Sequence, residues 1–172
     1  TYKDRIVYLP KIDTSGKTSM KGMFTNCSSM VGIPFLDTSR VTNMSTLFGN
    51  CFNLVCIPLL DTSKVTDMSK MFYFCYALNS LPILDTSKTT TMLYMLANCG
   101  GLCRVPLLDL SNVTNANNLV DYGYSLTFFK VKGLRYNLRT YASALTKDSL
   151  IYIINEKVYF VNTNFMTFSN VT

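Results

Sequence analysis

The sequence predicts an α/β solenoid in which each coil supplies one short parallel strand and one short helix. Three observations support this fold class. The same residue types recur every 24 positions, each unit contains an apolar pattern typical of a helix, and each contains a second pattern typical of a strand. The chain of 172 residues is 48% hydrophobic and 15% charged, as expected for a folded protein with a sizeable core.

The 24-residue period appears as columns of identical residues. Three of these columns are Asp13, Asp37, Asp61, Asp85 and Asp109; Cys27, Cys51, Cys75 and Cys99; and Pro10, Pro34, Pro58, Pro82 and Pro106. We therefore expect a solenoid over residues 1–133. Its predicted parts are an N-terminal half-coil at 1–12 and five units at 13–36, 37–60, 61–84, 85–108 and 109–132.

The helix pattern is clearest at Met68, Met71, Phe72 and Cys75, which follow the spacing i, i+3, i+4, i+7. This spacing places one apolar stripe along a helix. Thr66 precedes the stripe, and a threonine hydroxyl there can accept a hydrogen bond from a backbone N–H of the first turn. We expect a short helix with this cap in each unit.

The strand pattern is shown by Leu54, Ile57, Leu59 and Leu60, with Pro58 between the apolar positions. Proline cannot donate to a strand ladder, so it marks a strand edge or a position without a hydrogen bond. One strand of this L-x-x-L-x-L type and one short helix per turn predict a leucine-rich-repeat coil. The strands would stack about 4.8 Å apart in a parallel sheet.

The turn that joins strand and helix reads Asp-Thr-Ser. Asp61 can accept hydrogen bonds from its own downstream backbone in an Asx turn, and Ser63 can reinforce the turn. The alternative is a calcium ladder, because five stacked carboxylates repel one another unless something neutralises them. Calcium-binding repeats pair aspartate with glycine in shorter periods, and glycine does not accompany aspartate here. We favour the structural turn.

The cysteine column closes the apolar stripe, so its thiols are expected to point inward as small hydrophobic groups. Disulfides between neighbouring coils are the alternative. Cys56 and Cys103 lie off the column and are expected to be more accessible. The sequence has no histidine and no C-x-x-C pair, so we expect neither a metal site nor a cofactor.

The composition also limits the function. Without histidine, Ser-His, Cys-His and His-metal catalysis are excluded, and Glu156 is the only glutamate. We therefore expect no enzyme and no catalytic residue. The net charge of +6 is not gathered in a polybasic run, so nucleic acid is not indicated as a partner. No apolar stretch reaches about 18 residues, so membrane insertion is not expected.

Residues 60–78 read LDTSKVTDMSKMFYFCYAL, and this string resembles the repeats of the BspA-like leucine-rich-repeat surface proteins of bacteria. The resemblance covers about 12–133. It weakens in the fifth unit, where Leu110, Ala116 and Gly123 replace threonine, methionine and cysteine. Similar repeats occur in phage tail or fibre-like proteins.

The resemblance implies an extracellular protein, exposed on a bacterial surface or virion, that binds or adheres without enzymatic activity. Its implied partner is a host protein or a surface glycan, although the family has no fixed ligand. The alternative function is a structural spacer or assembly component that contacts other subunits of a larger surface or tail complex.

Residues 134–172 lose the period and are expected to form a small α+β capping segment over the last coil. The pattern predicts a helix at 146–155 and strands at 158–161 and 165–168. In the proteins that this tail weakly resembles, the pattern continues further, so a truncation at residue 172 is expected.

Three sets of residues are candidates for partner binding. Arg40, Lys64 and Lys88 form a basic column that either balances the aspartates or recognises an acidic glycan or anionic surface. The aromatic candidates, which either pack between coils or stack on sugar rings, are Tyr73, Phe74, Tyr76 and Tyr94, with Phe52, Tyr122 and Tyr124 nearby. Arg104 belongs to a variable column on the sheet face, where variation reflects either specificity or low constraint.

Overall fold

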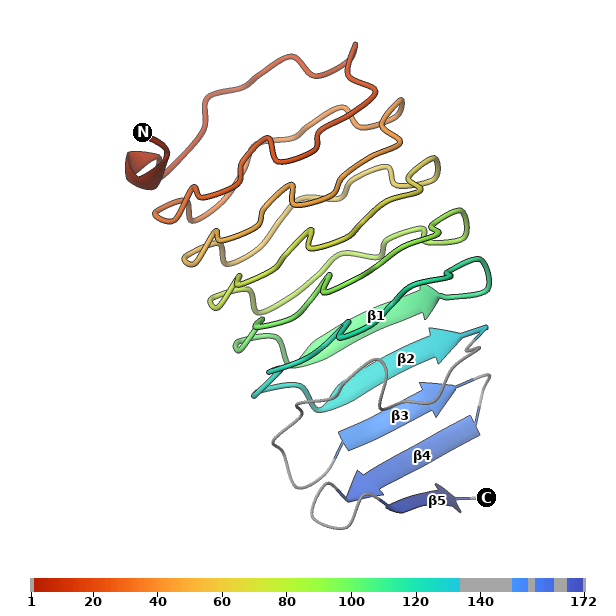
Figure 1. The fold of residues 1–172 in the computed structure, drawn as a ribbon. Coiled ribbons are helices and arrows are strands. Elements are labelled where there is room, and N and C mark those ends of the chain that lie inside the picture. Colours follow the sequence, from red (N-terminus) through yellow and green to blue (C-terminus); the bar gives the residue numbers. More distant parts are fainter. Residues whose placement is uncertain (1, 134–149, 155–156, 163–166, 172) are drawn as a thin grey trace.

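The computed structural model describes residues 2–133, 150–154, 157–162 and 167–171. The chain begins with a 3-10 helix, η1 (Tyr2–Arg5), and then winds through irregular coils that lie one on another (Figure 1). The regular strands follow in the C-terminal half. They are β1 (Arg104–Asp109), β2 (Phe128–Lys132), β3 (Leu150–Ile154), β4 (Lys157–Asn162) and β5 (Thr167–Val171).

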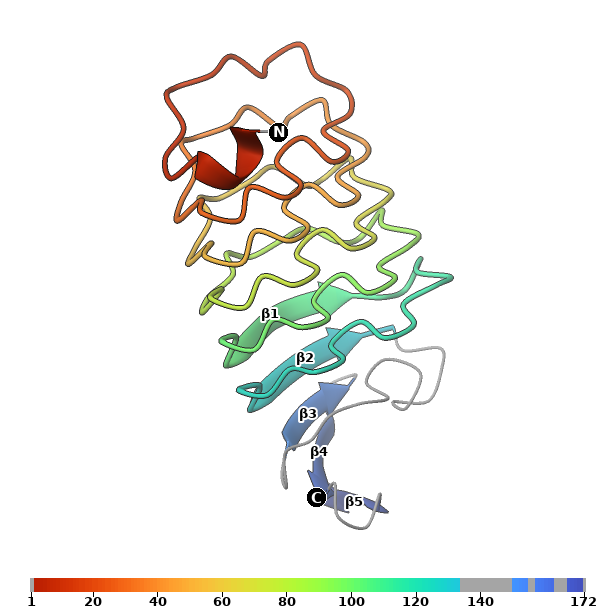
Figure 2. The same ribbon diagram turned by 60° about the vertical axis from the view of Figure 1, so that its left-hand side comes forward.

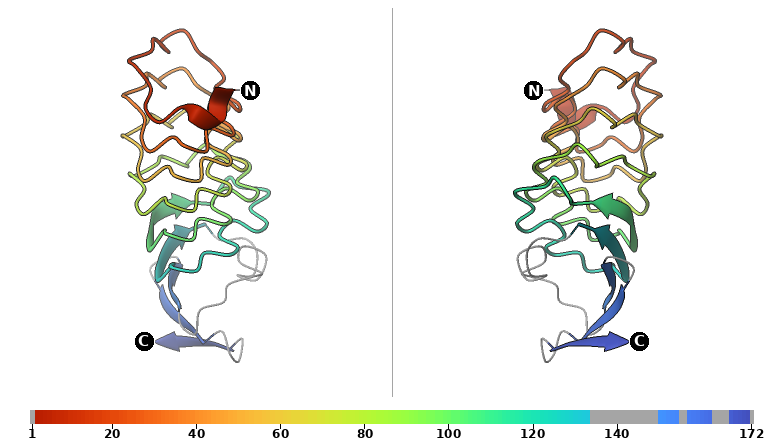
Figure 3. Two further views of the ribbon diagram at one scale, coloured as in Figure 1. Left: turned by 90° about the vertical axis from the view of Figure 1, so that its left-hand side faces the viewer. Right: turned by 90° about the vertical axis from the view of Figure 1, so that its right-hand side faces the viewer.

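The five strands form one sheet in the order β1-β2-β3-β4-β5. β1, β2 and β3 are parallel, whereas β4 and β5 are antiparallel to their neighbours. Figure 2 shows β1 and β2 in one wall of the stack of coils, with β3 continuing that wall. In the side views of Figure 3, η1 and the C-terminal strand lie at opposite ends of the molecule.

The predicted fold class, an α/β leucine-rich-repeat solenoid with a helix in every coil, is wrong. Residues 2–133 contain no α-helix, and the segments predicted to be helical, such as 68–75, run as consecutive turns. A strand is assigned in this part of the chain at β1 and β2, while the equivalent segments of the earlier units remain irregular.

The helix predicted in each unit does not form, because two positions in each coil adopt a left-handed backbone conformation. The non-glycine residues with positive φ are Asn26, Thr46, Asn50, Lys70, Phe74, Tyr94, Asn98, Asn118 and Tyr122. A right-handed helix cannot pass through such a residue. A chain of turns that reverses in this way still returns about every fourth side chain to the interior, so it produces the same apolar spacing as a helix.

The backbone groups freed from a helix bond to the next coil instead. The N–H groups of Met20 and Phe24 donate to the carbonyls of Asn43 and Leu47 at 2.9 and 3.0 Å. Isolated parallel bridges link Ser19, Asn43, Asp67, Thr91 and Asn115 in the same direction. Thr66, predicted as a helix cap, donates its hydroxyl to the carbonyl of Thr42, 24 residues earlier, at 3.2 Å. The 24-residue period is thus a period of bonds between coils.

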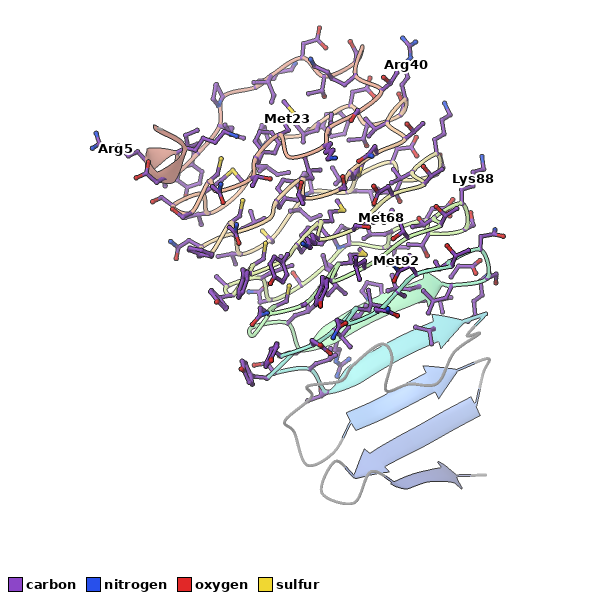
Figure 4. The ribbon with its side chains drawn as sticks, viewed as in Figure 1. Arg5, Met23, Arg40, Met68, Lys88 and Met92 are labelled. Carbon is purple, nitrogen blue, oxygen red and sulfur yellow. The ribbon has the colours of Figure 1, made fainter. Side chains whose placement is uncertain are left out.

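The core is a set of ladders with one rung in each coil. The rings of Phe24, Phe48 and Phe72 stack with centroids 5.7 and 5.6 Å apart. Met68 and Met92 are fully buried beside them in the interior of the stack (Figure 4). Similar apolar side chains at equivalent positions give neighbouring coils similar packing, with Leu96 in the place of the phenylalanine in the fourth unit.

The C-terminal predictions are partly wrong. The helix expected at 146–155 is contradicted where β3 occupies 150–154, and the remainder of that segment lies outside the described residues. β3 is rich in isoleucine, which is stiff at χ1 and favours a strand, and it pairs with β2 with Ile151 opposite Phe128. The strand expected at 158–161 is confirmed as part of β4, and that expected at 165–168 overlaps β5 at its last two positions.

Candidate functional site

The structure brings the four predicted aromatic residues into one connected group with Phe52. Ring centroids are 5.6 Å apart for Phe52–Tyr76 and for Phe74–Tyr76, 4.2 Å for Tyr73–Phe74 and 5.9 Å for Tyr73–Tyr94. Phe74 and Tyr94 occupy positions with φ of 60° and 55°, at the corners of turns. Three neighbouring coils therefore gather five rings.

The five rings do not all contribute to the same exposed surface. Tyr73 and Tyr94 hold Lys70 between them, with its ammonium nitrogen 5.6 and 5.7 Å from the two ring centroids. This is a cation–π arrangement within the molecule, so these two residues have a packing role. Phe52 and Tyr76 are 41% and 46% exposed and remain available to a ligand.

Phe52, Phe74 and Tyr76 form one wall of an open groove of about 770 Å³. The rest of the groove is polar and is lined by Lys3 and Asp4 of η1 together with Asn26, Ser28 and Asn50. The Asn50 side-chain amide donates to Asn26 Oδ1 at 2.8 Å, and this bond fixes how both amides face the groove. We call this the aromatic groove.

Sequence reasoning missed the polar half of the aromatic groove. Its signal was the column Asn26, Asn50 and Phe74, in which every member has positive φ. Asparagine tolerates this conformation, whereas a bulky aromatic residue adopts it at a cost. The column continues with Asn98 and Tyr122, so an aromatic residue takes the place of asparagine twice, and Phe74 is the one of the two that lines the groove.

The basic column Arg40, Lys64 and Lys88 is exposed, as predicted, but lies away from the aromatic groove. Figure 4 shows Arg40 and Lys88 at one end of the elongated coils and Arg5, next to the groove residues of η1, at the other. Lys64 donates to the carbonyl of Ser39 at 2.9 Å, so it also ties one coil to the previous one. The structure does not unite the two predicted sets into one site.

Arg104, the remaining predicted site residue, is exposed at the start of β1. It borders a smaller hollow of about 360 Å³ together with Ser80 and Cys103. This hollow is separate from both the aromatic groove and the basic column.

The Asp-Thr-Ser segments form the predicted Asx turns. In each of the first four units, Oδ1 of the aspartate accepts hydrogen bonds from the backbone N–H and the hydroxyl of the serine two residues later. The hydroxyl of Ser63, followed by its N–H, holds the pKa of Asp61 below its usual value. Across the described residues, no three acidic or cysteine side chains come together as a metal site would require.

The cysteine column is buried, as predicted. Cys51, Cys75 and Cys99 each donate a hydrogen bond from sulfur to a phenylalanine carbonyl at 3.1 Å. All six cysteines are free thiols, and Cys56 and Cys103 are exposed. Burial raises the pKa of Cys51 to about 12, so the buried thiols are unreactive at neutral pH.

A column of exposed apolar residues is the main surface feature that the sequence analysis did not find. Its members, which we call the apolar ladder, are Phe35, Leu59, Ile83 and Leu107. The prediction had counted Leu59 among the apolar residues of a strand, but 66% of it is exposed, while its neighbour Leu60 is buried. The 24-residue spacing of these four large apolar side chains was the sequence pattern that could have revealed the ladder.

The stacked coils and their open grooves define a repeat-built protein whose surface features run in columns along the stack. A family described as mycoplasma protein of unknown function, DUF285, matches residues 13–128, and the chain belongs to this family. No curated protein matches the chain, and neither does any solved structure. Among the described residues, no helix is long and apolar enough to cross a membrane.

Proposed function

We propose that this chain is a non-enzymatic binding module of the BspA-like type, exposed on a bacterial surface or phage tail, and that it recognises a carbohydrate in the aromatic groove. Two observations support the general class. The repeat string at 60–78 resembles BspA-like repeats, and the chain belongs to the DUF285 family. The lack of histidine supports a binding role rather than catalysis.

The observation that carries the carbohydrate proposal is the pairing of two exposed rings with two fixed amides in one groove. The rings of Phe52 and Tyr76 offer flat apolar faces, and a sugar ring has an apolar face of similar size. Asn26 and Asn50 supply amide donors and acceptors for hydroxyl groups. A groove that combines apolar walls with a few placed polar groups is the usual form of a small-molecule site.

The residue type at Phe74 supports the same proposal. The left-handed conformation recurs in every coil and belongs to the fold, but the equivalent positions in the two preceding coils carry asparagine. A bulky residue there costs about 1–2 kcal/mol. Here the ring of Phe74 packs against Tyr76 at the edge of the groove.

A glycan array with the full chain tests the proposal. We expect binding by the native protein and a loss of about tenfold or more in Phe52→Ala/Tyr76→Ala, because each stacking contact contributes about 1 kcal/mol. The matched control is Tyr122→Ala/Tyr124→Ala, which removes an exposed aromatic pair outside the groove. Equal losses in both double variants would contradict the assignment of the site.

The basic column provides a second comparison. If an acidic glycan is bound there instead, Arg40→Ala/Lys64→Ala/Lys88→Ala will lose binding and the groove variant will retain it. If the native protein binds no glycan, the alternative function of a structural spacer or assembly component is favoured. The apolar ladder supports this alternative, since exposed apolar columns are a common feature of protein–protein contacts.

A further inference from the structure

The apolar ladder lies next to a row of aspartates. Phe35, Leu59 and Ile83 are 72%, 66% and 75% exposed, and each is followed two residues later by an aspartate. A groove of about 730 Å³ runs along this face, lined by these apolar residues and by the Asp-Thr-Ser turns of the same coils. A soluble surface rarely leaves such a continuous apolar column uncovered.

The aspartates of this groove each keep one oxygen without a partner. In Asp37, Asp61 and Asp85, Oδ1 accepts the bonds from serine, whereas Oδ2 has no hydrogen bond or ion pair within the described residues. Asp109 differs, because its Oδ2 lies 2.9 Å from the ammonium nitrogen of Lys132 on the neighbouring strand β2. The chain itself therefore shows the type of group that this position binds.

We propose that this groove docks a basic amphipathic helix of a protein partner, with the helix axis along the stack. Its apolar side chains would cover the apolar ladder, and its lysine or arginine side chains would pair with Oδ2 of Asp37, Asp61 and Asp85. The lysines nearest in sequence do not fill these places. Lys64 donates to the carbonyl of Ser39 at 2.9 Å, and neither Lys64 nor Lys88 forms an ion pair with these carboxylates among the described residues. After the serine hydrogen bonds, the charges of Lys64 and Lys88 still help to lower the pKa values of Asp61 and Asp85.

The spacing favours a helix over an extended peptide. The coils are about 4.8 Å apart and one helical turn rises about 5.4 Å, so the two periods drift by only about 2 Å over three rungs. Alternate residues of an extended strand are about 6.8 Å apart and lose register after one rung. The net charge of +6 gives a cationic peptide no general attraction to this protein, so any electrostatic attraction must come from the local row of carboxylates.

The probe is a fluorescent helical peptide of about 18 residues built from leucine and lysine, compared with the same peptide carrying glutamate in place of lysine. Fluorescence anisotropy with the full chain, at low ionic strength and at about 0.3 M salt, measures both affinities. We expect the lysine peptide to bind, the glutamate peptide to bind at least about tenfold more weakly, and the difference to shrink with salt.

The variant Asp37→Asn/Asp61→Asn/Asp85→Asn removes the charges and keeps the turns, since Asn43 already accepts the same two bonds from Ser45 at 2.9 and 2.8 Å. We expect a loss of about tenfold at low salt. Ile83→Ser is expected to weaken binding at both salt concentrations. Asp61→Asn alone serves as a second variant if the triple variant unfolds, and Tyr122→Ser, outside the groove, is the matched control.

Three outcomes would overturn the proposal. They are failure of the lysine peptide to bind, equal binding of both peptides, and unchanged affinity after removal of the carboxylates. Sedimentation equilibrium tests whether a second copy of this chain occupies the groove instead. Self-association that is abolished by Ile83→Ser would assign the groove to that second copy and exclude the basic helix. This proposal is independent of the carbohydrate site, which the same variants leave intact.

Discussion

The hydroxyl of Ser63 donates a hydrogen bond of 2.7 Å to Asp61 Oδ1, and the backbone N–H of Ser63 donates to the same oxygen at 3.0 Å. Two donors on one carboxylate oxygen stabilise the ionised form. The same pair occurs at Asp37 and Asp85, whose pKa values are lowered for the same reason. The turns at these three aspartates are therefore stronger when the carboxyl group is ionised.

This arrangement predicts that acid destabilises the protein. A group whose pKa is lower in the folded state contributes stability above its unfolded pKa of about 4, and this contribution disappears as the pH falls through the folded value. We expect the melting temperature to be flat above pH about 5 and to fall below pH about 4. Asp37→Asn/Asp61→Asn/Asp85→Asn will show a shallower fall, because the amide keeps the turn at every pH. An equally steep fall in the variant would contradict the role of these carboxylates.

Two threonines at equivalent positions should respond differently to the loss of their hydroxyls. Thr62 Oγ1 donates to the carbonyl of Asp85 at 2.9 Å, whereas the buried Oγ1 of Thr38 has no partner. Thr62→Val removes a hydrogen bond and leaves a carbonyl less satisfied, so we expect a cost of about 1 kcal/mol. Thr38→Val removes an unsatisfied buried group and should be neutral or stabilising. Urea unfolding of both variants measures the difference in free energy of unfolding, and equal costs would contradict the prediction.

The strain at Phe74 is separable from its ring contacts by comparing two substitutions. Both Phe74→Asn and Phe74→Ala remove the ring, but asparagine tolerates the left-handed conformation better than alanine. We expect the asparagine variant to be more stable by about 1 kcal/mol, and its amide would extend the contact that joins Asn50 to Asn26. Thermal unfolding gives the stability difference. On the glycan array both variants should bind more weakly than the native protein; retention of full binding would remove Phe74 from the site.

The six thiols are expected to fall into two reactivity classes. Cys56 and Cys103 are exposed and should react with a thiol reagent in the native protein. The four thiols of the cysteine column, with Cys51 and Cys99 at a pKa of about 12, should react only when the protein unfolds. Mass spectrometry after brief labelling, with and without denaturant, counts the modified sites. Labelling of Cys75 in the native protein would show that the stack opens between its central coils.

The repeat made some parts of this fold predictable. The columns identified which residues share an environment, so the burial of Cys75 and the Asx turn at Asp61 followed from the sequence. The backbone between these columns did not follow. Met68 and Phe72 lie on the same side of the chain both in an α-helix and in a series of turns that passes through a positive φ. The positions with positive φ include lysine and threonine rather than glycine, so the residue types did not indicate a left-handed conformation.

The candidate site was predictable in its parts but not in its grouping. The aromatic residues around Tyr76 and the basic column were recognised from the repeat, although the sequence left open whether the aromatic rings pack between coils or face a ligand. Only the structure shows that η1 folds back to complete the aromatic groove, while Arg40 and Lys88 lie at the other end of the coils. The position of Leu59 was misjudged because an apolar residue in a short strand segment can face either side, and its neighbour Leu60 faces the core.

The bonds between coils also determine how this molecule can change in length. Each internal coil contacts the coil before it and the coil after it through the same set of bonds, such as those of Thr42, Thr66 and Thr90. Duplication of one 24-residue unit would therefore add a rung to every column without altering an existing contact. Unequal recombination within the gene could thus lengthen the carboxylate row and the apolar ladder together. The length of this binding surface would then change during evolution in steps of one coil.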